Sequence, residues 1–218
     1  MKIAVLGTGM VGESIGSRLI ELGHSVMMGS RTANNEKAAA FVSKHPGGKA
    51  RAGTFFDAAA FGELVFNCTK GAEVLNILKS AGVENLKGKI LVDVTNSLDF
   101  SKGMPPTLSV CNTDSLGEQI QAAFPEAKVV KALNTMNCLI MVNPGLVNNG
   151  DHNVFLSGND ADAKKQVAKI LKSFGWAEKN ITDLGDISTA RGPEMILPLW
   201  LSIYMSTGSG AFNFKIVS

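Results

Sequence analysis

The sequence contains few of the residues on which several common structural and catalytic schemes depend. Of its 218 residues, three are cysteine, three are histidine and one is tyrosine. The cysteines, Cys68, Cys111 and Cys138, are odd in number and show no CxxC spacing, which argues against a disulfide framework and a thiolate zinc site. Cys68 and Cys138 stand among apolar residues, so we interpret them as buried thiols rather than nucleophiles.

Catalytic arrangements that need histidine or tyrosine are missing as well. Tyr204 has Gly208 four places on, so the Tyr-x-x-x-Lys pair of short-chain dehydrogenases is absent. His24 begins a predicted strand, where we expect a structural role, and His45 and His152 stand in polar segments typical of the surface. No spacing matches a metal site, a Ser/His/Asp triad or a Cys/His pair. We therefore predict no catalytic side chain and no metal ligand.

Strong charge and long apolar runs are also lacking. The formal net charge is +2 and the positive residues are dispersed, which argues against nucleic acid and anionic membranes as partners. The longest apolar stretch, 195–205, contains Pro198 and is too short to span a bilayer. Glycines and Glu13 interrupt the first apolar run too early for a signal peptide. We expect a cytoplasmic protein, and 218 residues that are 45% hydrophobic suffice for a sizeable core in one or two domains.

What the sequence does contain is a dinucleotide-binding fingerprint near its start. The segment Gly7-Thr8-Gly9-Met10-Val11-Gly12 stands between the apolar run 3–6 and a helical pattern that reaches Glu21. Gly7 permits the tight turn, Gly9 lets the backbone approach a pyrophosphate, and Gly12 lets the helix pack closely on the strand. The N–H groups and the positive dipole end of that helix would then face the phosphates. These six residues are our predicted pyrophosphate site.

The end of the second predicted strand, 25–28, indicates which cofactor binds. A carboxylate at this place would hold the 2′-hydroxyl of NAD, but none appears before Glu36. Ser30, Arg31 and Thr32 stand there instead. Arginine pairs with phosphate bidentately and keeps its charge, so this turn favours the 2′-phosphate of NADP. A solvated turn with a surface arginine is the alternative.

Apolar strands alternate with helical patterns along the chain, which predicts an α/β fold with a doubly wound, mainly parallel Rossmann-type sheet. Beyond the first β-α-β unit, we expect strands at 64–68, 90–94 and 128–133, and helices at 35–44, 72–80 and 115–124, the last capped by Asp114 or Ser115. The pattern then becomes less regular, with strands at 153–157 and 176–183 and helices at 160–174 and 189–204. We predict an NADP-binding domain at 1–143 and a small C-terminal α/β lobe at 144–218 that completes the acceptor site.

In an open parallel sheet the ligand lies outside the carboxyl ends of the strands. Polar loops follow three of the apolar strands, and these loops suit ribose hydroxyls and a carboxamide. They contain Asn67, Cys68, Thr69 and Lys70, then Thr95 and Asn96, then Asn134 and Thr135. Ordinary polar turns are the alternative. Because reduction of a carbonyl needs a matched proton donor, the lack of one favours a ring cofactor as hydride acceptor, which asks the protein mainly for distance and orientation.

The chain resembles the NADP-dependent oxidoreductases of the 8-hydroxy-5-deazaflavin coenzyme and the related NADPH-binding domains of the STEAP metalloreductases. The resemblance covers nearly the whole chain. Its motifs are the glycine turn 7–12, the segment from Gly23-His24 to Gly29-Ser30-Arg31, the run 128–135 (KVVKALNT), the run 154–160 (VFLSGND) and a closing helix around Leu197-Pro198-Leu199.

The resemblance implies that the glycine turn carries the pyrophosphate and that Ser30 to Thr32 hold the 2′-phosphate. It also implies that Asn67 to Lys70, Thr95 to Asn96, and Ala132 to Thr135 surround the nicotinamide. The chain departs from the archaeal enzymes where they have Pro-Trp, since it reads Thr69-Lys70-Gly71-Ala72 there. The acceptor is therefore open between a deazaflavin and a flavin.

Two other functions remain possible at this point: an imine or 3-hydroxyacid reductase of the same superfamily, and a non-catalytic NADPH-binding sensor. The apolar final helix, with Trp200 and Tyr204, is either the seam of a homodimer or a helix that packs on its own domain.

Overall fold

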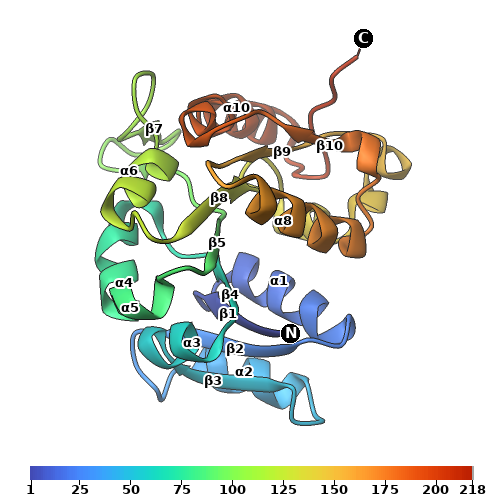
Figure 1. Cartoon of the computed structure of the whole chain (residues 1–218). Coiled ribbons are helices and arrows are strands. Elements are labelled where there is room, and N and C mark those ends of the chain that lie inside the picture. Colours follow the sequence, from blue (N-terminus) through green and yellow to red (C-terminus); the bar gives the residue numbers. More distant parts are fainter. Residues whose placement is uncertain (218) are drawn as a thin grey trace.

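The computed structural model describes residues 1–217, and its framework is one eight-stranded sheet (Figure 1). The strands are β1 (Lys2–Leu6), β2 (Ser25–Ser30), β3 (Ala50–Thr54), β4 (Leu64–Asn67), β5 (Ile90–Asp93), β8 (Lys128–Ala132), β9 (Val154–Ser157) and β10 (Ile181–Asp183). Their order is β10-β9-β8-β5-β4-β1-β2-β3. Neighbouring strands are parallel except for β8 and β9. The chain order reverses between β1 and β4, as in a Rossmann-type sheet, so the predicted fold class is confirmed.

Helices cover both faces of this sheet. One face carries α1 (Met10–Glu21), α2 (Glu36–Lys44), α7 (Cys138–Val142) and α8 (Ala161–Phe174). The other carries α3 (Phe55–Phe61), α4 (Val74–Ala81), α5 (Val83–Leu86) and α6 (Leu116–Ala123). Short α9 (Arg191–Met195) and α10 (Leu197–Thr207) follow, and α10 lies near the β9 and β10 end of the sheet (Figure 1).

The central strands are apolar throughout because both of their faces are buried. In β1, Ile3 and Val5 join the core cluster under α1, while Ala4 and Leu6 join the cluster under α3 and α4. In β4, Leu64 and Phe66 face the first cluster and Val65 the second. The period-two alternation of a strand thus distributes one apolar run between two cores.

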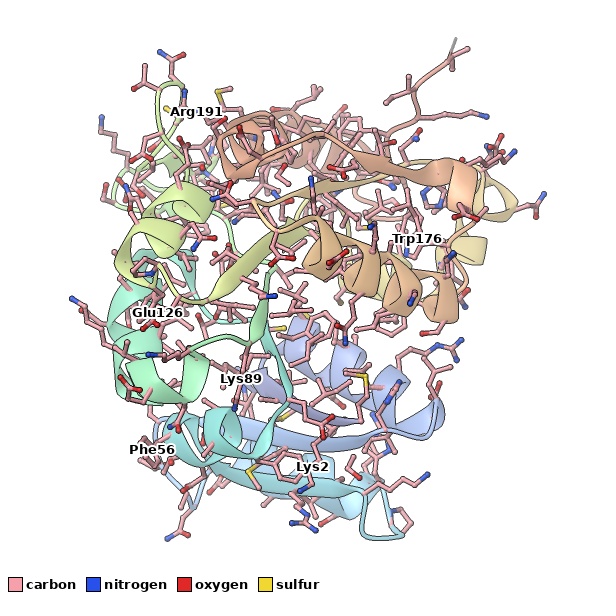
Figure 2. All side chains as sticks on the ribbon, viewed as in Figure 1. Lys2, Phe56, Lys89, Glu126, Trp176 and Arg191 are labelled. Carbon is pink, nitrogen blue, oxygen red and sulfur yellow. The ribbon has the colours of Figure 1, made fainter. Side chains whose placement is uncertain are left out.

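Residues after 143 extend the same sheet. Strand β9 pairs antiparallel with β8, and β10 pairs parallel with β9. Trp176, which follows α8, is 2% exposed and donates its indole N–H to the carbonyl of Met141 at 3.0 Å (Figure 2). This contact anchors α8 on α7. The boundary near 143 stays a prediction.

Several element predictions were wrong in detail. The strand at 176–183 is confined to 181–183, because 178–180 form the 3₁₀ turn η4 (Glu178–Asn180). The helix at 189–204 is divided into η5 (Ile187–Ala190), α9 and α10, with Pro198 in the first turn of α10. Strand β3 and helices α3 and α7 were not predicted. His152 is also buried rather than at the surface, and its ring contacts the carbonyl of Pro144 at 2.9 Å.

The loop after β5 contains a two-stranded hairpin, β6 (Leu98–Asp99) with β7 (Thr107–Leu108). The remaining 3₁₀ turns are η1 (Gly71–Glu73), η2 (Pro144–Leu146) and η3 (Asn148–Gly150). The cap predicted for α6 is confirmed at Ser115, whose hydroxyl accepts the N–H of Glu118.

Candidate dinucleotide site

The glycine turn has the geometry that the fingerprint requires. Gly7 has φ +114°, and a Cβ on it would lie 2.6 Å from the carbonyl oxygen of Cys68. A Cβ on Gly12 would lie 2.1 Å from the carbonyl oxygen of Gly7. A Cβ on Gly9, in contrast, would meet nothing within 4 Å. Gly7 and Gly12 are therefore required by the turn itself, while Gly9 leaves open space above the backbone.

Helix α1 begins directly at this open space. Gly9 is its N-cap and provides no side chain to cap the helix. The first backbone bond of the helix runs from Glu13 to Gly9, so the N–H groups of Met10, Val11 and Gly12 have no helical partner. Free N–H groups at a helix N-terminus suit a phosphate. The cradle therefore fits a pyrophosphate.

A cleft of about 450 Å³ opens beside this turn. The residues from the predicted set that line it are Gly7, Thr8, Gly9, Ser30, Arg31, Cys68, Thr69 and Lys70. The structure thus brings together the loops after β1, β2 and β4. Lys37 and Asn35 line it too and were missed by the sequence analysis. The signal for Lys37 was its position in the first turn of the helix that follows the Arg31 turn.

The residues at the end of β2 differ in burial and in their hydrogen-bond partners. Ser30 is buried, and its hydroxyl donates to the carbonyl of Thr32 at 2.6 Å, which shapes the turn. Arg31 is exposed and its guanidinium pairs with the carboxylate of Glu73 at 2.9 Å. Thr32 is exposed and does not line the cleft. Asn35 caps α2 by accepting the N–H of Ala38.

In the loops after β4, β5 and β8, most polar side chains form hydrogen bonds with other protein groups. Asn67 donates to Asp93 at 2.7 Å and accepts the hydroxyl proton of Thr69 at 2.8 Å. The side chain of Asn96 donates to the carbonyl of Asn134, and that of Asn134 donates back to Asn96, both at 2.9 Å. These loops therefore offer a ligand mainly their backbone groups.

The residues after β8 are buried at the carboxyl edge of the sheet. Ala132, Asn134 and Thr135 are each at most 3% exposed. Leu133 has φ +64°, a left-handed conformation that is uncommon for leucine. Strained backbone of this kind is often found at functional sites. Neither these residues nor Thr95 and Asn96 line the cleft beside the glycine turn.

A buried charge cluster lies beneath these loops, and sequence reasoning missed it. The ammonium of Lys131 pairs with Asp93 and, at 2.8 Å, with Glu194, and all three side chains are at most 1% exposed. Burial alone lowers the pKa of Lys131, but attraction to the two carboxylates outweighs it and the pKa lies above the usual range. Lys131 therefore stays charged. The available signal was a lysine and an aspartate inside otherwise apolar strands.

The thiol of Cys68 lies at the same edge of the sheet. Burial raises its pKa well above the usual range, and the negative charge of Asp93 adds to the effect. A protonated thiol is a poor nucleophile. This agrees with the prediction that Cys68 is not a nucleophile. The predicted burial was wrong in degree, because Cys68 and Cys138 are both half-buried.

A second groove, of about 630 Å³, lies between α1 and α7. Met10 and Leu139 line it, and both are strongly exposed, at 78% and 58%. Because Met10 also belongs to the glycine turn, this groove begins next to the predicted pyrophosphate site. Apolar side chains there suit a flat ring.

Some other properties of residues 1–217 bear on function. Within that range, no cluster of three or more His, Cys, Asp or Glu side chains is placed to hold a metal ion. Nor does any helix there have the length and hydropathy needed to cross a membrane.

Comparison with known proteins agrees with this geometry. The model of the family "NADP oxidoreductase coenzyme F420-dependent" matches residues 2–97. The F420-dependent NADP reductase of Methanothermobacter marburgensis is 26% identical over 211 residues, which cover 93% of this chain and 92% of that protein. The metalloreductase STEAP3 of Rattus norvegicus is 28% identical over 204 residues, or 91% of this chain. The match spans only 38% of STEAP3.

A solved structure gives a stronger match. The provisionally assigned F420-dependent NADP-reductase of Arthrobacter sp. FB24 is 53% identical, with a TM-score of 0.93 and full coverage of both chains. The similarity to this protein covers the whole chain, whereas the family model matches only residues 2–97. The cleft and glycine turn support a nicotinamide dinucleotide as cofactor, and the chain belongs to the family of coenzyme F420-dependent NADP oxidoreductases.

Proposed function

We propose that this protein transfers a hydride between NADP(H) and a flavin or deazaflavin ring. The observation that carries the choice of NADP is the cationic end of the cleft, where Arg31 and Lys37 line the wall after β2. No carboxylate ends β2 to hold the free 2′-hydroxyl of NAD, and the carboxylate of Glu73, which comes from η1, is paired with Arg31. A 2′-phosphate would gain charge-assisted bonds from both cations.

We assign each part of the dinucleotide to a different group of residues along the carboxyl edge of the sheet. The N–H groups at the start of α1 would hold the pyrophosphate, and Arg31, with Ser30 and Thr32 shaping its turn, would hold the 2′-phosphate. The loops after β4, β5 and β8 would surround the nicotinamide, as the resemblance implies. When bound, NADPH supplies the hydride, so the protein needs to provide alignment and to exclude water.

The groove between α1 and α7 is our proposed acceptor site. It adjoins the glycine turn at Met10 and has the apolar Leu139 on its opposite wall. The carboxylate of Glu13 pairs with Lys44 at 2.8 Å, which reduces the negative charge at its rim. A planar ring lying against Met10 would be next to the cofactor. Gly210 of the proposed C-terminal lobe lies close behind this groove, since an added Cβ there would be 3.0 Å from the side-chain amide of Asn137, which lines the groove.

A turnover assay tests this function directly. Purified protein with saturating NADPH is mixed with an 8-hydroxy-5-deazaflavin, FMN or FAD, and oxidation of NADPH is followed at a wavelength where it absorbs. We expect turnover with at least one ring acceptor. If NADPH binds tightly by calorimetry and none of the three is reduced, transfer to a ring acceptor is refuted, and the alternatives are an imine or 3-hydroxyacid reductase and a cofactor-binding sensor.

Two further properties are part of the proposal. Leu199, Tyr204 and Met205 on α10 are exposed, which is consistent with a homodimer seam, although Trp200 stacks on Tyr204 and Phe212 of its own chain. Light scattering on the purified protein would decide the oligomeric state. We also expect the protein in the cytoplasm.

A further inference from the structure

The peptide between Thr95 and Asn96 is held by an unusually well buried ammonium group. The carbonyl oxygen of Thr95 accepts a hydrogen bond from Nζ of Lys131 at 2.8 Å. Lys131 reaches it from the neighbouring strand β8 and is 1% exposed. This contact places a full positive charge against the carbonyl of one peptide in the loop after β5.

The ammonium itself has little freedom to move. Its three donors are used by Thr95, Asp93 and Glu194. Glu194 in turn accepts the N–H groups of Leu116 and Gly117, at 2.9 and 3.0 Å, at the start of α6. The second negative charge therefore lies at the positive end of a helix dipole. Strand β5, strand β8, α6 and α9 all constrain the same nitrogen.

The direction of the adjacent N–H follows from peptide geometry. A trans peptide directs its C=O and N–H to opposite sides, and here the C=O points to Lys131, on the side of the sheet that α6 covers. The N–H of Asn96 consequently points away from α6. This N–H has no hydrogen-bond partner within residues 1–217, and the side-chain amide of Asn96 is engaged with Asn134. Asn96 is partly exposed, whereas its neighbours Thr95 and Ser97 are buried.

The position of Asn96 in the sheet indicates which part of a ligand it meets. Strand β5 is two strands from β1, on the side opposite to β2 and Arg31. At a strand spacing of about 4.8 Å, that is roughly 10 Å from the glycine turn. A dinucleotide with its adenosine half over β2 and its pyrophosphate over β1 would bring its other half to this loop.

We infer that Lys131 is a positioning residue, which holds the Thr95–Asn96 peptide so that the N–H of Asn96 donates to the carboxamide oxygen of the nicotinamide. The inference rests on the proposed function, because it assumes the dinucleotide in the cleft. It makes the orientation of the nicotinamide ring dependent on Glu194 of the C-terminal lobe as well. None of the three charged residues touches the cofactor.

Amide NMR on the intact, ¹⁵N-labelled protein tests the donor. NADP⁺ should move the amide proton of Asn96 strongly downfield, whereas adenosine 2′,5′-bisphosphate, which lacks the nicotinamide half, should leave it nearly unchanged. Equal responses to the two ligands would overturn the inference. So would binding of NADP⁺ with no response at Asn96, and in that case the proposed cofactor site would still stand. If neither ligand binds, the proposed function and this inference fall together.

A charge-neutral variant tests the role of Lys131. Lys131→Met combined with Asp93→Asn and Glu194→Gln removes the cluster without leaving a buried unpaired charge. Affinity for NADPH should fall about 5- to 10-fold, as for one lost hydrogen bond, with affinity for adenosine 2′,5′-bisphosphate unchanged. Unchanged NADPH affinity in the folded variant would refute the positioning role. If the variant does not fold, the NMR comparison on the unaltered protein still decides.

The chain offers a matched control. Lys164 is also a mostly buried lysine, and it bonds the carboxylate of Asp183 and the carbonyl of Gly185, both at 2.7 Å. It lies on α8, away from the loop after β5. Lys164→Met combined with Asp183→Asn should leave affinity for both ligands as in the unaltered protein.

Discussion

The guanidinium of Arg31 lies 2.9 Å from the carboxylate of Glu73, so an ion pair connects the end of β2 with the turn η1. Arg31 lines the cleft from one side, and Lys70, immediately before η1, lines it from the other. The pair therefore bridges the adenosine end of the cleft. It means that the residue proposed to bind the 2′-phosphate already has an anionic partner in the protein.

Replacing Arg31 tests the assignment of NADP. We expect Arg31→Ala to weaken NADPH binding by about 1–3 kcal/mol more than NADH binding, because only NADPH loses a charge-assisted pair. Calorimetry with each cofactor measures the difference. Arg51→Ala serves as the control, since Arg51 is exposed on β3 and packs over Phe61 rather than in the cleft. Equal losses for both cofactors would remove Arg31 from the 2′-phosphate site.

Replacing Glu73 should have the opposite effect. The carboxylate competes with the 2′-phosphate for Arg31, and an exposed pair of this kind contributes at most about 1 kcal/mol. Glu73→Gln should therefore tighten NADPH binding up to about 5-fold and leave NADH binding nearly unchanged. The gain should disappear in the Arg31→Ala background, which a double-mutant cycle measures. Weaker NADPH binding in Glu73→Gln would show that Glu73 supports the phosphate site instead.

Two glycine variants separate folding from binding. A Cβ at position 9 meets no protein atom, so Gly9→Ala should unfold at the same denaturant concentration as the unaltered protein. It should nevertheless lose most of its NADP⁺ affinity, because the methyl group occupies the space that the pyrophosphate needs. Gly12→Ala should be destabilised as well, since its Cβ collides with the carbonyl of Gly7. Denaturation curves and calorimetry on both variants check this contrast.

Acid should weaken the contact between α6 and α9. A hydrogen bond from Arg191, labelled in Figure 2, holds the pKa of the Glu118 carboxyl below its usual range, although partial burial opposes the shift. Because the unfolded chain protonates this glutamate first, the contribution is complete above the ordinary glutamate pKa, about 4.3, and is lost as pH falls through the lower folded value.

The variant Glu118→Gln should remove that part of the pH dependence. Urea denaturation between pH 3 and pH 7 should show a shallower loss of stability on the acid side than in the unaltered protein. Glu178→Gln is a suitable control, because Glu178 is largely exposed and its pair with Lys172, at 3.3 Å, lies far along the chain from α6. If Glu118→Gln lost as much stability between pH 7 and pH 3 as the unaltered protein, the pair of Glu118 with Arg191 would contribute no pH-dependent stability.

Local sequence was sufficient wherever one short segment carries the physical requirement. The turn at Gly7 needs a positive φ and close backbone contacts, and only glycine supplies both, so the fingerprint could be recognised without a structure. The apolar strands predicted the parallel sheet for a similar reason, since a strand buried on both faces cannot carry alternating polar residues. Predictions became weaker after residue 143, where Pro198 and the 3₁₀ turns divide segments that look continuous in sequence.

The sequence by itself thus determined the fold class, the glycine turn and the candidate residue for the 2′-phosphate. Only the tertiary structure decided which charges meet, because Arg31 and Glu73 are 42 positions apart and Lys131 and Glu194 are 63 apart. No periodicity or motif encodes such pairs. They form where strand order and helix packing bring distant side chains together. Arg31 and Glu73 meet at the surface, whereas Lys131 and Glu194 meet in the interior, where an unpaired charge would be too costly to bury.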